Sequence, residues 1–290
     1  MISVDFAAEL ERSLKVHLEV PGVPKPLIAS IRYSLLGPGK RIRPRLALEC
    51  TQLIGLAPEA GLAAALAIEM IHCFTLIHDD LPCMDDDDFR RGKPSNHKQF
   101  NESTALLAGD ALMALAFDAL LDAEPFVLPK NLLNAIRMLS EASGPRGVIG
   151  GQGLEETLGK SATIHDLRWM HAKKTGALFE AALLLPKALQ GIPAQDPRGK
   201  AIDLFASELG LAFQVMDDLD DAATEGRDPT NILFYLPEAA ARAQTLGSLR
   251  NTCSGLEKHW GSAARPLLAI ATEITDRLTL PSLTSTLGNR

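Results

Sequence analysis

The sequence predicts an all-α protein, and three observations lead to that prediction. Apolar residues make up 46% of the 290 residues and aromatic residues only 5%, so we expect an aliphatic core. Apolar residues recur at steps of three and four along most of the chain, as they do on one face of a helix. Alternating runs bounded by turn signals, which would predict strands, do not occur. We expect one helical domain that covers residues 1–290.

Six segments show the helical pattern most clearly. The first is rich in Ala and ends in two aspartates, where Pro82 disfavours a further helical turn. The others have the same periodicity and lie between Gly- and Pro-rich stretches such as GPGKRIRP, SGPRGVIGGQG, QGIPAQDPRG and EGRDPTN. The six expected helices are Ala60–Asp80, Glu102–Asp122, Asn131–Ala142, Ile164–Leu185, Lys200–Ala223 and Pro237–Leu249.

Charge and hydropathy exclude several classes of protein. A net charge of −7 argues against a general nucleic-acid binder, which needs a basic surface. The longest apolar run, Thr104–Leu121, is interrupted by Asp110 and Asp118, so we expect no membrane insertion. The first residues lack the basic region of a signal peptide. We therefore expect a soluble cytoplasmic protein with four reduced thiols, which are Cys50, Cys73, Cys83 and Cys253.

The stretch IHDDLPCMDDDDFRRGK concentrates negative charge at the end of the first helix. A solvated charge run is the ordinary explanation, and for acidic clusters in general it has better than even odds. His72, Thr75 and Asp79 share one helix face at spacings of three and four. Asp80 follows, and Asp85 returns from the turn after Pro82. These carboxylates offer hard oxygen ligands from a helix end and its loop.

A second acidic motif, VMDDLDD, ends a helix in the other half of the chain. Asp217 and Asp221 share a face, and Asp218 lies beside them. Carboxylates at a helix C-terminus repel one another and the helix dipole, and a divalent cation removes that conflict. Bare aspartates without His or Cys ligands suit Mg²⁺, whereas the spacing and central Gly of an EF-hand are absent. The separation of the motifs allows them to face each other across a helical bundle.

Basic residues gather at four places in the chain. Taken singly, each is most simply a solvated side chain, with odds of about two in three. Together with two carboxylate motifs, they suggest a diphosphate held through metal on one side and directly by Arg and Lys on the other. The four places are Lys40, Arg41 and Arg43; Arg90 and Arg91; Lys173 and Lys174; and Arg227.

From about Tyr33 to Asp221 the chain resembles the short-chain trans-prenyltransferases, which are the farnesyl and geranylgeranyl diphosphate synthases. GKRIRP is similar to the isopentenyl diphosphate-binding segment of that family. EMIHCFTLIHDDLPCMDDDDFRRGKPSNHK is similar to its first aspartate-rich motif with a four-residue spacer, as in the bacterial farnesyl and plant-type geranylgeranyl enzymes. LLAGDAL, GGQ, KTGAL and FQVMDDLDD follow in the family's order. The resemblance implies a helical bundle of the isoprenoid synthase type with a central active-site cavity, and a homodimer.

The resemblance also implies a role for each matching residue. Three Mg²⁺ ions are expected, two at the first motif and one at the second, and the substrates are isopentenyl diphosphate and an allylic diphosphate. The residues expected to be catalytic are Asp79, Asp80, Asp85, Arg90, Lys174, Asp217 and Asp218. The expected metal ligands are Asp79, Asp80 and Asp85, then Asp217, Asp218 and Asp221. Arg90, Lys174, Thr175 and Gln214 would contact the allylic diphosphate; Lys40, Arg43, His72 and Arg91 would bind isopentenyl diphosphate; Arg227 would replace a family lysine.

The implied reaction is a head-to-tail condensation. The allylic diphosphate ionises, the isopentenyl double bond attacks the carbocation, and a proton is lost to the departing diphosphate. Phe74 lies on the first helix about 7.5 Å below Asp79. An aromatic residue there, beside Thr75, would close the bottom of the tunnel that receives the growing prenyl chain. In the family, an aromatic residue at this position accompanies the fifteen-carbon product. Ordinary core packing explains Phe74 equally well. We expect chiefly farnesyl diphosphate.

The match weakens after Asp221. The family has a longer loop with two lysines, and here Asp228 aligns with the second of them. Glu155 and Glu156 likewise replace an aspartate-rich continuation of GGQ. Two alternatives therefore stay open: a geranylgeranyl diphosphate synthase, and a weakly active or non-catalytic homologue that binds prenyl diphosphates. A terpene cyclase is disfavoured, since GKRIRP and the FRRG arginines serve a second diphosphate that a cyclase does not need.

Overall fold

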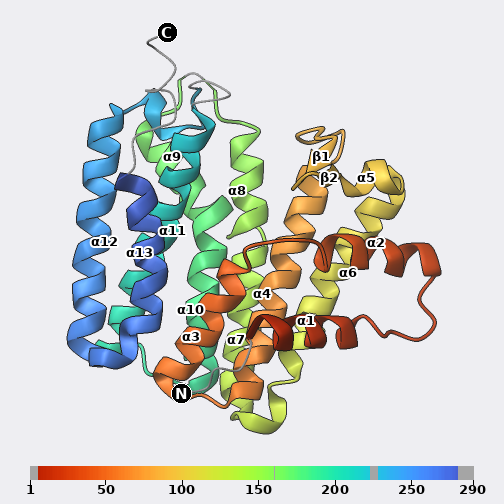
Figure 1. Cartoon of the computed structure of the whole chain (residues 1–290), viewed down its shortest axis with the longest axis horizontal. Helices are drawn as coiled ribbons and strands as arrows, with labels where there is room; N and C mark the ends of the chain where they lie inside the picture. Colours follow the sequence, from red (N-terminus) through yellow and green to blue (C-terminus); the bar gives the residue numbers. More distant parts are fainter. Residues whose placement is uncertain (1–5, 160, 223–227, 280–290) are drawn as a thin grey trace. The chain divides into compact units, whose positions relative to one another are not determined.

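The computed structural model describes residues 6–159, 161–222 and 228–279, which are helical almost throughout (Figure 1). The chain divides into two compact units. The first comprises residues 1–136 and 188–190, and the second comprises residues 137–187 and 191–290. The all-α prediction is confirmed. The prediction of a single domain stays a prediction.

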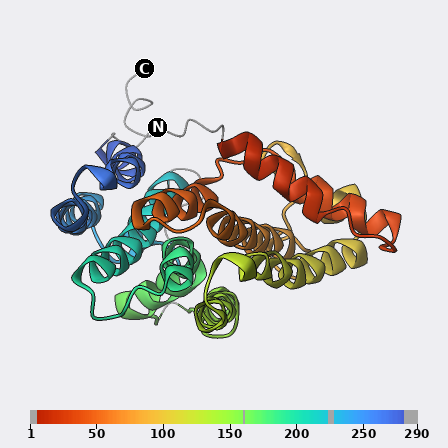
Figure 2. The same ribbon diagram turned by 90° about the horizontal axis from the view of Figure 1, so that it is seen from below.

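The first unit is built around one buried helix. Of its helices, α4 contacts both α3 and α6, and it lies between them in Figure 2. Buried Ala, Ile and Leu side chains along α4 supply most of this contact surface. Its elements are α1 (Phe6–His17), α2 (Lys25–Leu35), α3 (Ile42–Ile54), α4 (Pro58–Asp79), β1 (Phe89–Arg90), β2 (Lys93–Pro94), α5 (Asn96–Gln99), α6 (Glu102–Leu121), η1 (Glu124–Phe126) and the start of α7 (Pro129–Ser143).

The ends of α4 follow from its sequence. Pro58 occupies the first helical turn, where its missing N–H costs nothing. Asp80 caps the C-terminal end, and the chain then turns before Pro82 as predicted. Gly109 lets α6 approach α4 closely, because a Cβ there would lie 2.1 Å from Nε2 of His78. The packing of this unit therefore fixes where the first aspartate motif begins.

A short hairpin follows the first aspartate motif and was not predicted. In it Phe89 pairs with Pro94 and Arg90 with Lys93. The two linking residues, Arg91 and Gly92, both have positive φ, of 54° and 76°. Such a pair matches the twist of a two-residue hairpin, but Arg in this conformation is strained by roughly 1–2 kcal/mol. The chain tolerates this strain at the centre of RRGK.

In the second unit α11 contacts α12 and α13, which also contact each other (Figure 1). Asp196 caps α11 by accepting a hydrogen bond from the backbone N–H of Arg198 at 2.8 Å. The elements are α8 (Val148–Glu155), α9 (Ile164–His171), the π-helical η2 (Ala172–Gly176), α10 (Ala177–Gln190), α11 (Pro197–Asp221), η3 (Ile232–Phe234), α12 (Glu238–Trp260), η4 (Gly261–Ala264) and α13 (Arg265–Thr279).

Two of the predicted helices were wrong in their extent. The segment 164–185 is not one regular helix, because η2 interrupts it, and α10 continues past Pro186 to Gln190. One proline removes a single backbone hydrogen bond, and the buried Leu185 and Leu189 hold the helix together around it. The segment predicted as 237–249 runs on to Trp260, since its polar second half still buries Leu256. The other four predicted helices agree to within three residues at each end.

Two stretches are long and apolar enough to cross a membrane by length and composition alone. One is α4, in which 78% of the most apolar 18-residue stretch is buried within the protein, as in a core helix. The other is Glu102–Phe126, of which only 39% is buried. The four cysteines are all free thiols, as predicted.

Candidate functional site

The first aspartate motif folds back on the end of α4. The backbone N–H of Asp85 donates to the carbonyl oxygen of Asp79 at 2.9 Å, and that of Asp86 donates to Leu81 at 3.2 Å. These two bonds close one tight turn, which Asp79 enters and Asp85 leaves. Asp79 is half-buried and Asp85 is exposed. The turn therefore brings the backbone of Asp85 back to that of Asp79 at the helix end.

Asp80 is the buried member of this motif and is paired with Arg90. Nε of Arg90 donates to Oδ1 of Asp80 at 2.7 Å, and Nη2 donates to the same oxygen. Burial raises the pKa of the Asp80 carboxyl, and the hydrogen bond and charge of Arg90 oppose that shift. Arg90 also reaches the exposed Asp87 at 2.9 Å. A metal at Asp80 and a diphosphate at Arg90 would each have to compete with this pair.

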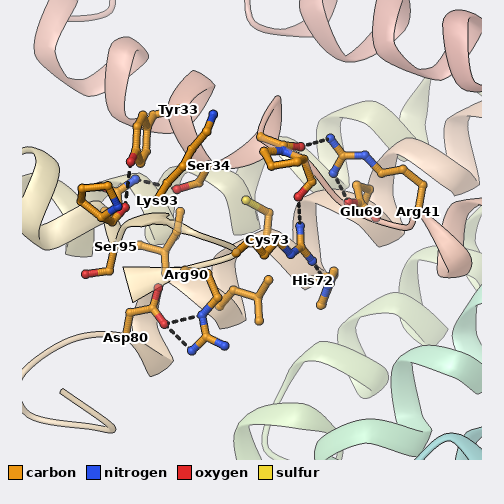
Figure 3. Close-up of a pocket in the computed structure, with 17 residues that line it drawn as sticks. Tyr33, Ser34, Arg41, Glu69, His72, Cys73, Asp80, Arg90, Lys93 and Ser95 are labelled. Atoms are coloured by element: carbon orange, nitrogen blue, oxygen red, sulfur yellow. Dashed lines mark hydrogen bonds and ion pairs between the residues drawn. The ribbon is translucent and has the colours of Figure 1, made fainter. Parts of the chain in front are cut away.

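Arg91 turns from the hairpin toward α4. Its Nη1 donates to the carbonyl oxygen of Pro38 at 2.8 Å, and its Nη2 lies 3.4 Å from Nε2 of His72 (Figure 3). Burial and the positive charges of Arg43 and Arg91 hold the pKa of His72 well below its usual range. His72 is therefore neutral near pH 7, and its Nε2 can accept a hydrogen bond from a donor such as Arg91.

A small, open pocket collects these groups within the first unit (Figure 3). It brings together His72, Arg90, Arg91 and Asp80, but Lys40 and Arg43 are not in its lining. Lys40 is exposed, and Arg43 is half-buried. The lining residues are Tyr33, Ser34, Gly37, Pro38, Arg41, Glu69, His72, Cys73, Leu76, Ile77, Asp80, Arg90, Arg91, Lys93, Pro94, Ser95 and Asn96.

Arg41, also in this pocket, is a structural residue. It pairs with the buried Glu69 and with Glu11 at 3.0 Å. It also donates to the carbonyl oxygens of Leu35 and Gly37, at 2.8 and 2.9 Å. These bonds tie the loop before α3 to α4 (Figure 3). For Arg41, the ordinary explanation of a solvated side chain was wrong.

Phe74 and Thr75 are not among the residues that line this pocket, and Phe74 is buried in the first unit whereas Thr75 is half-buried. Phe74 is 3% exposed, and its ring packs edge-on against His78 at a centroid distance of 5.6 Å. Thr75 donates from Oγ1 to the carbonyl oxygen of His72 at 2.8 Å. Both contacts are compatible with core packing, and neither tests the expected role in product length.

In the second unit, Asp218 is the buried member of the second motif. Its Oδ1 accepts from Nε2 of Gln214 at 2.8 Å, and its Oδ2 accepts from the backbone N–H of Ile232 at 2.8 Å. Burial raises the pKa of the Asp218 carboxyl, and His171, 3.8 Å from Oδ2, together with Gln214 opposes the shift. The carboxylate is thereby held in one orientation by two donors.

Further residues extend the hydrogen-bond network around Asp218. Gln214 accepts a hydrogen bond from Oγ1 of Thr175, so Thr175, Gln214 and Asp218 form a chain. Nδ2 of Asn231 donates to the backbone carbonyl of Asp218 at 2.7 Å. Asn231 and His171 were not predicted as site residues. Asn231 caps η3, and nothing in the sequence marks it as a partner of a residue thirteen positions earlier.

Lys174 lies in the π-helical segment η2 and pairs with Glu155. Gly151 allows this approach, because a Cβ there would lie 2.2 Å from the backbone nitrogen of Lys174. Short π-helical segments are frequently found at functional sites. The GGQ and KTGAL stretches are therefore in contact, and Glu155 neutralises the lysine that was expected to bind substrate.

The end of the second motif differs in exposure from its start. Asp217 is half-buried and Asp221 is exposed. Arg227 lies outside the described residues. Asp228 accepts from the N–H of Thr230 at 2.8 Å and also from its hydroxyl. This turn leads directly into η3, whose Ile232 N–H binds Asp218. The aspartate thus has a local structural role.

Comparisons with known proteins show the family and the fold of this chain. The family model described as polyprenyl synthetase matches residues 24–229. A farnesyl diphosphate synthase of Geobacillus stearothermophilus is 42% identical over 214 residues, which are 73% of this chain and 71% of that protein. Geranylgeranyl pyrophosphate synthase 7 of Arabidopsis thaliana is 36% identical over 95% of this chain and 80% of its own. The crystal structure of a geranyltransferase from Legionella pneumophila superposes with a TM-score of 0.84 at 31% identity, covering 95% of this chain and 96% of that one.

Proposed function

This chain belongs to the polyprenyl synthetase family as a short-chain trans-prenyltransferase with the isoprenoid synthase fold, and we propose that it makes chiefly farnesyl diphosphate. Its activity is prenyl diphosphate chain elongation, of the dimethylallyltranstransferase or geranyltransferase type. The family implies isopentenyl diphosphate and an allylic diphosphate as substrates. The observation that supports the diphosphate chemistry is the tight turn that joins Asp79 and Asp85 through their backbones at the end of α4.

The donor set at this turn fits Mg²⁺, on which enzymes of this family typically depend. Asp79 and Asp85 offer carboxylate oxygens on one turn, and hard oxygen ligands of this kind suit Mg²⁺. We assign two ions to Asp79, Asp80 and Asp85. We assign a third to Asp217, with Asp218 and Asp221. When bound, Mg²⁺ would neutralise charge on the diphosphate as it leaves.

The basic residues complete the binding of two diphosphates. Arg90 and Lys174, with Thr175 and Gln214, would contact the allylic diphosphate once their present partners, Asp80 and Glu155, are displaced. Guanidinium and ammonium groups aimed at the leaving oxygens stabilise the charge that develops there. Lys40, Arg43, His72 and Arg91 would bind isopentenyl diphosphate, with neutral His72 as a hydrogen-bonding group. Arg227 keeps its expected role as a cation beyond Asp221.

The reaction course follows from these roles. Arg90 and Lys174 stabilise the diphosphate as the allylic C–O bond breaks, which leaves a carbocation in an apolar helical environment. The isopentenyl double bond attacks the cation and forms the new C–C bond. The departing diphosphate takes the proton that is lost, so no side-chain base is assigned.

The experiment that tests this proposal measures products. The purified protein is incubated with Mg²⁺, isopentenyl diphosphate and dimethylallyl or geranyl diphosphate, and the products are separated by chromatography. We expect the fifteen-carbon diphosphate, and a loss of turnover of about 10²-fold or more in Asp85→Asn and in Asp217→Asn. Asp118→Asn, an exposed aspartate on α6, is the control. Tight diphosphate binding without elongation would instead identify a non-catalytic homologue.

Product length rests on Phe74. Replacing it with Ala should lengthen the product, whereas Phe205→Ala, an equally buried change in the second unit, should not. A geranylgeranyl diphosphate synthase is the second candidate, because the match to the Arabidopsis enzyme extends over 95% of this chain. If the wild-type protein makes chiefly the twenty-carbon diphosphate, it is a geranylgeranyl diphosphate synthase.

We also propose a homodimer that pairs through α6. Leu107, Ala114 and Leu121 lie at seven-residue intervals on this helix and are all exposed, which gives an apolar stripe along one face. Such stripes are buried in oligomers. Leu107→Glu should give a monomer by light scattering, whereas Leu133→Glu, which changes an exposed leucine on α7, should not. The single catalytic domain over residues 1–290, its central cavity and its cytoplasmic location remain predictions.

A further inference from the structure

Three side chains that the proposed reaction does not use come together in the first unit. They are Asp86 and Asp88, from the acidic run, and His97 of α5, which follows the hairpin (Figure 1). A carboxylate oxygen of each aspartate and a ring nitrogen of the histidine all lie within 4.8 Å of one another. Both aspartates are exposed, whereas His97 is only 6% exposed.

His97 has one ring nitrogen without a hydrogen-bond partner. Nδ1 lies 3.1 Å from the hydroxyl oxygen of Ser95, but Nε2 is buried and has no partner among the described residues. A hydroxyl that accepts from Nδ1–H would leave the lone pair on Nε2. Metal-bound histidines commonly have their second nitrogen oriented in this way. A buried ring nitrogen without a partner, on a histidine that lies beside two carboxylates, is a feature that hydrogen bonding among the described residues does not explain.

The backbone holds these three residues in position. The N–H of Ser95 donates to the carbonyl oxygen of Asp88 at 2.9 Å, which links the start of the hairpin to the residue that orients His97. Asp86 adopts a left-handed conformation with φ of 53°, and its N–H donates to Leu81. Oδ1 of Asp88 pairs with Lys98 at 2.7 Å, and a carboxylate has a second oxygen for another ligand.

We propose that Asp86, Asp88 and His97 bind a borderline divalent cation such as Zn²⁺, at a site separate from the Mg²⁺ ligands. Zinc bonds of about 2.0–2.2 Å to nitrogen and oxygen place neighbouring ligand atoms about 3.3–3.6 Å apart. The exposed side chains of Asp86 and Asp88 reach this spacing from the present one by rotation. The imidazole favours Zn²⁺ or Co²⁺ over Mg²⁺, which prefers oxygen.

A cation bound at such a site would restrict the motion of the segment between Asp86 and His97. Asp86 lies before the hairpin and His97 after it, so a cation shared by both would close the segment that carries Arg90 and Arg91. The cation would act on the position of these arginines and would not touch the reacting atoms.

Zn²⁺ is titrated calorimetrically into the full-length protein in excess Mg²⁺ and without substrates, so that the oxygen-only sites are already filled. We expect one equivalent of Zn²⁺ to bind, with affinity reduced by more than about tenfold in Asp86→Asn and in Asp88→Asn. Asn tolerates the left-handed backbone at position 86, and both positions are exposed, so these variants should fold. Asp87→Asn, which removes the same charge between them, should bind Zn²⁺ as the wild type does.

A second measurement reads the histidine directly. On addition of Zn²⁺, the Nε2 resonance of His97 should shift, and amides of residues 89–94 should exchange with solvent more slowly. Absence of Zn²⁺ binding in excess Mg²⁺ would overturn the proposal. Equal losses of affinity in Asp87→Asn and in the two cluster variants, or an unshifted His97, would also overturn it. None of these readouts depends on turnover, so they stand apart from the test of the proposed function.

Discussion

Arg90 places two nitrogens on one oxygen of Asp80, and this pair joins the end of α4 to the hairpin that follows it. The side chain of Asp80 is 3% exposed and that of Arg90 is 35% exposed. Removing the partner of a buried charge costs more than the pair itself contributes, because the remaining charge is left without compensation.

We therefore expect Arg90→Gln to lower the free energy of unfolding by about 2 kcal/mol, a value reduced from that of a fully buried pair because Arg90 is partly exposed. Added Mg²⁺ should restore part of this loss, since a cation at Asp80 replaces the missing charge. Urea unfolding with and without Mg²⁺ measures both effects. Arg146→Gln, which breaks an exposed pair with Glu141, should change stability by less than about 0.5 kcal/mol.

Stability should also depend on His72 as the pH falls. The folded protein holds the pKa of His72 well below 6.5, so the unfolded chain takes up this proton first. The free energy of unfolding should therefore fall as the pH drops from 6.5 toward the lower folded value, by up to about 1.4 kcal/mol per pH unit. His72→Gln should remove this slope, and His165→Gln, at an exposed position on α9, should keep it. A slope that survives in His72→Gln would assign the effect to another group.

Two glycines on α8 should respond oppositely to alanine. Gly151→Ala forces a methyl group against the backbone of Lys174, and we expect a loss of about 1–3 kcal/mol together with weaker binding of the allylic substrate. Gly153→Ala places its methyl group in open space and should stabilise the helix by about 0.5–1 kcal/mol. Thermal unfolding of both variants provides the measurement. Equal effects would show that the close approach of α8 to η2 is not maintained.

The pair between Lys174 and Glu155 gives a kinetic prediction. If Lys174 binds the allylic diphosphate, Glu155 competes with that substrate, so Glu155→Gln should lower its KM several-fold with little change in kcat. A fall in kcat would instead assign Glu155 a part in metal binding, as a substitute for the family's aspartates. Glu156→Gln is the control, since Glu156 lies beside Glu155 and is not paired with Lys174.

Much of the fold could be predicted, because the helices follow from apolar periodicity and from where prolines and glycines stand. The return of Asp85 to Asp79 could also be predicted from the turn after Pro82. The hairpin at Arg91 could not, since its left-handed arginine contradicts local preference and is held by contacts to Pro38 and His72. The hydrogen-bond network around Asp218 depends on Asn231 and Ile232, which reach it only through tertiary structure.

The π-helical segment η2 determines how the side chains of α9 are rotated about the helix axis relative to those of α10. A π-helical turn holds more residues than an α-helical one, so the length of the chain between 172 and 176 determines how α9 is rotated relative to α10. If the same five residues formed a regular α-helix, each would add about 100° of rotation, which is more than a residue adds in a π-helical turn, and the residues on either side would turn by most of 100° relative to each other. Such a change would remove no functional group, yet Thr175 would no longer meet Gln214. At this point of the molecule, the backbone conformation matters as much as the identity of the residues.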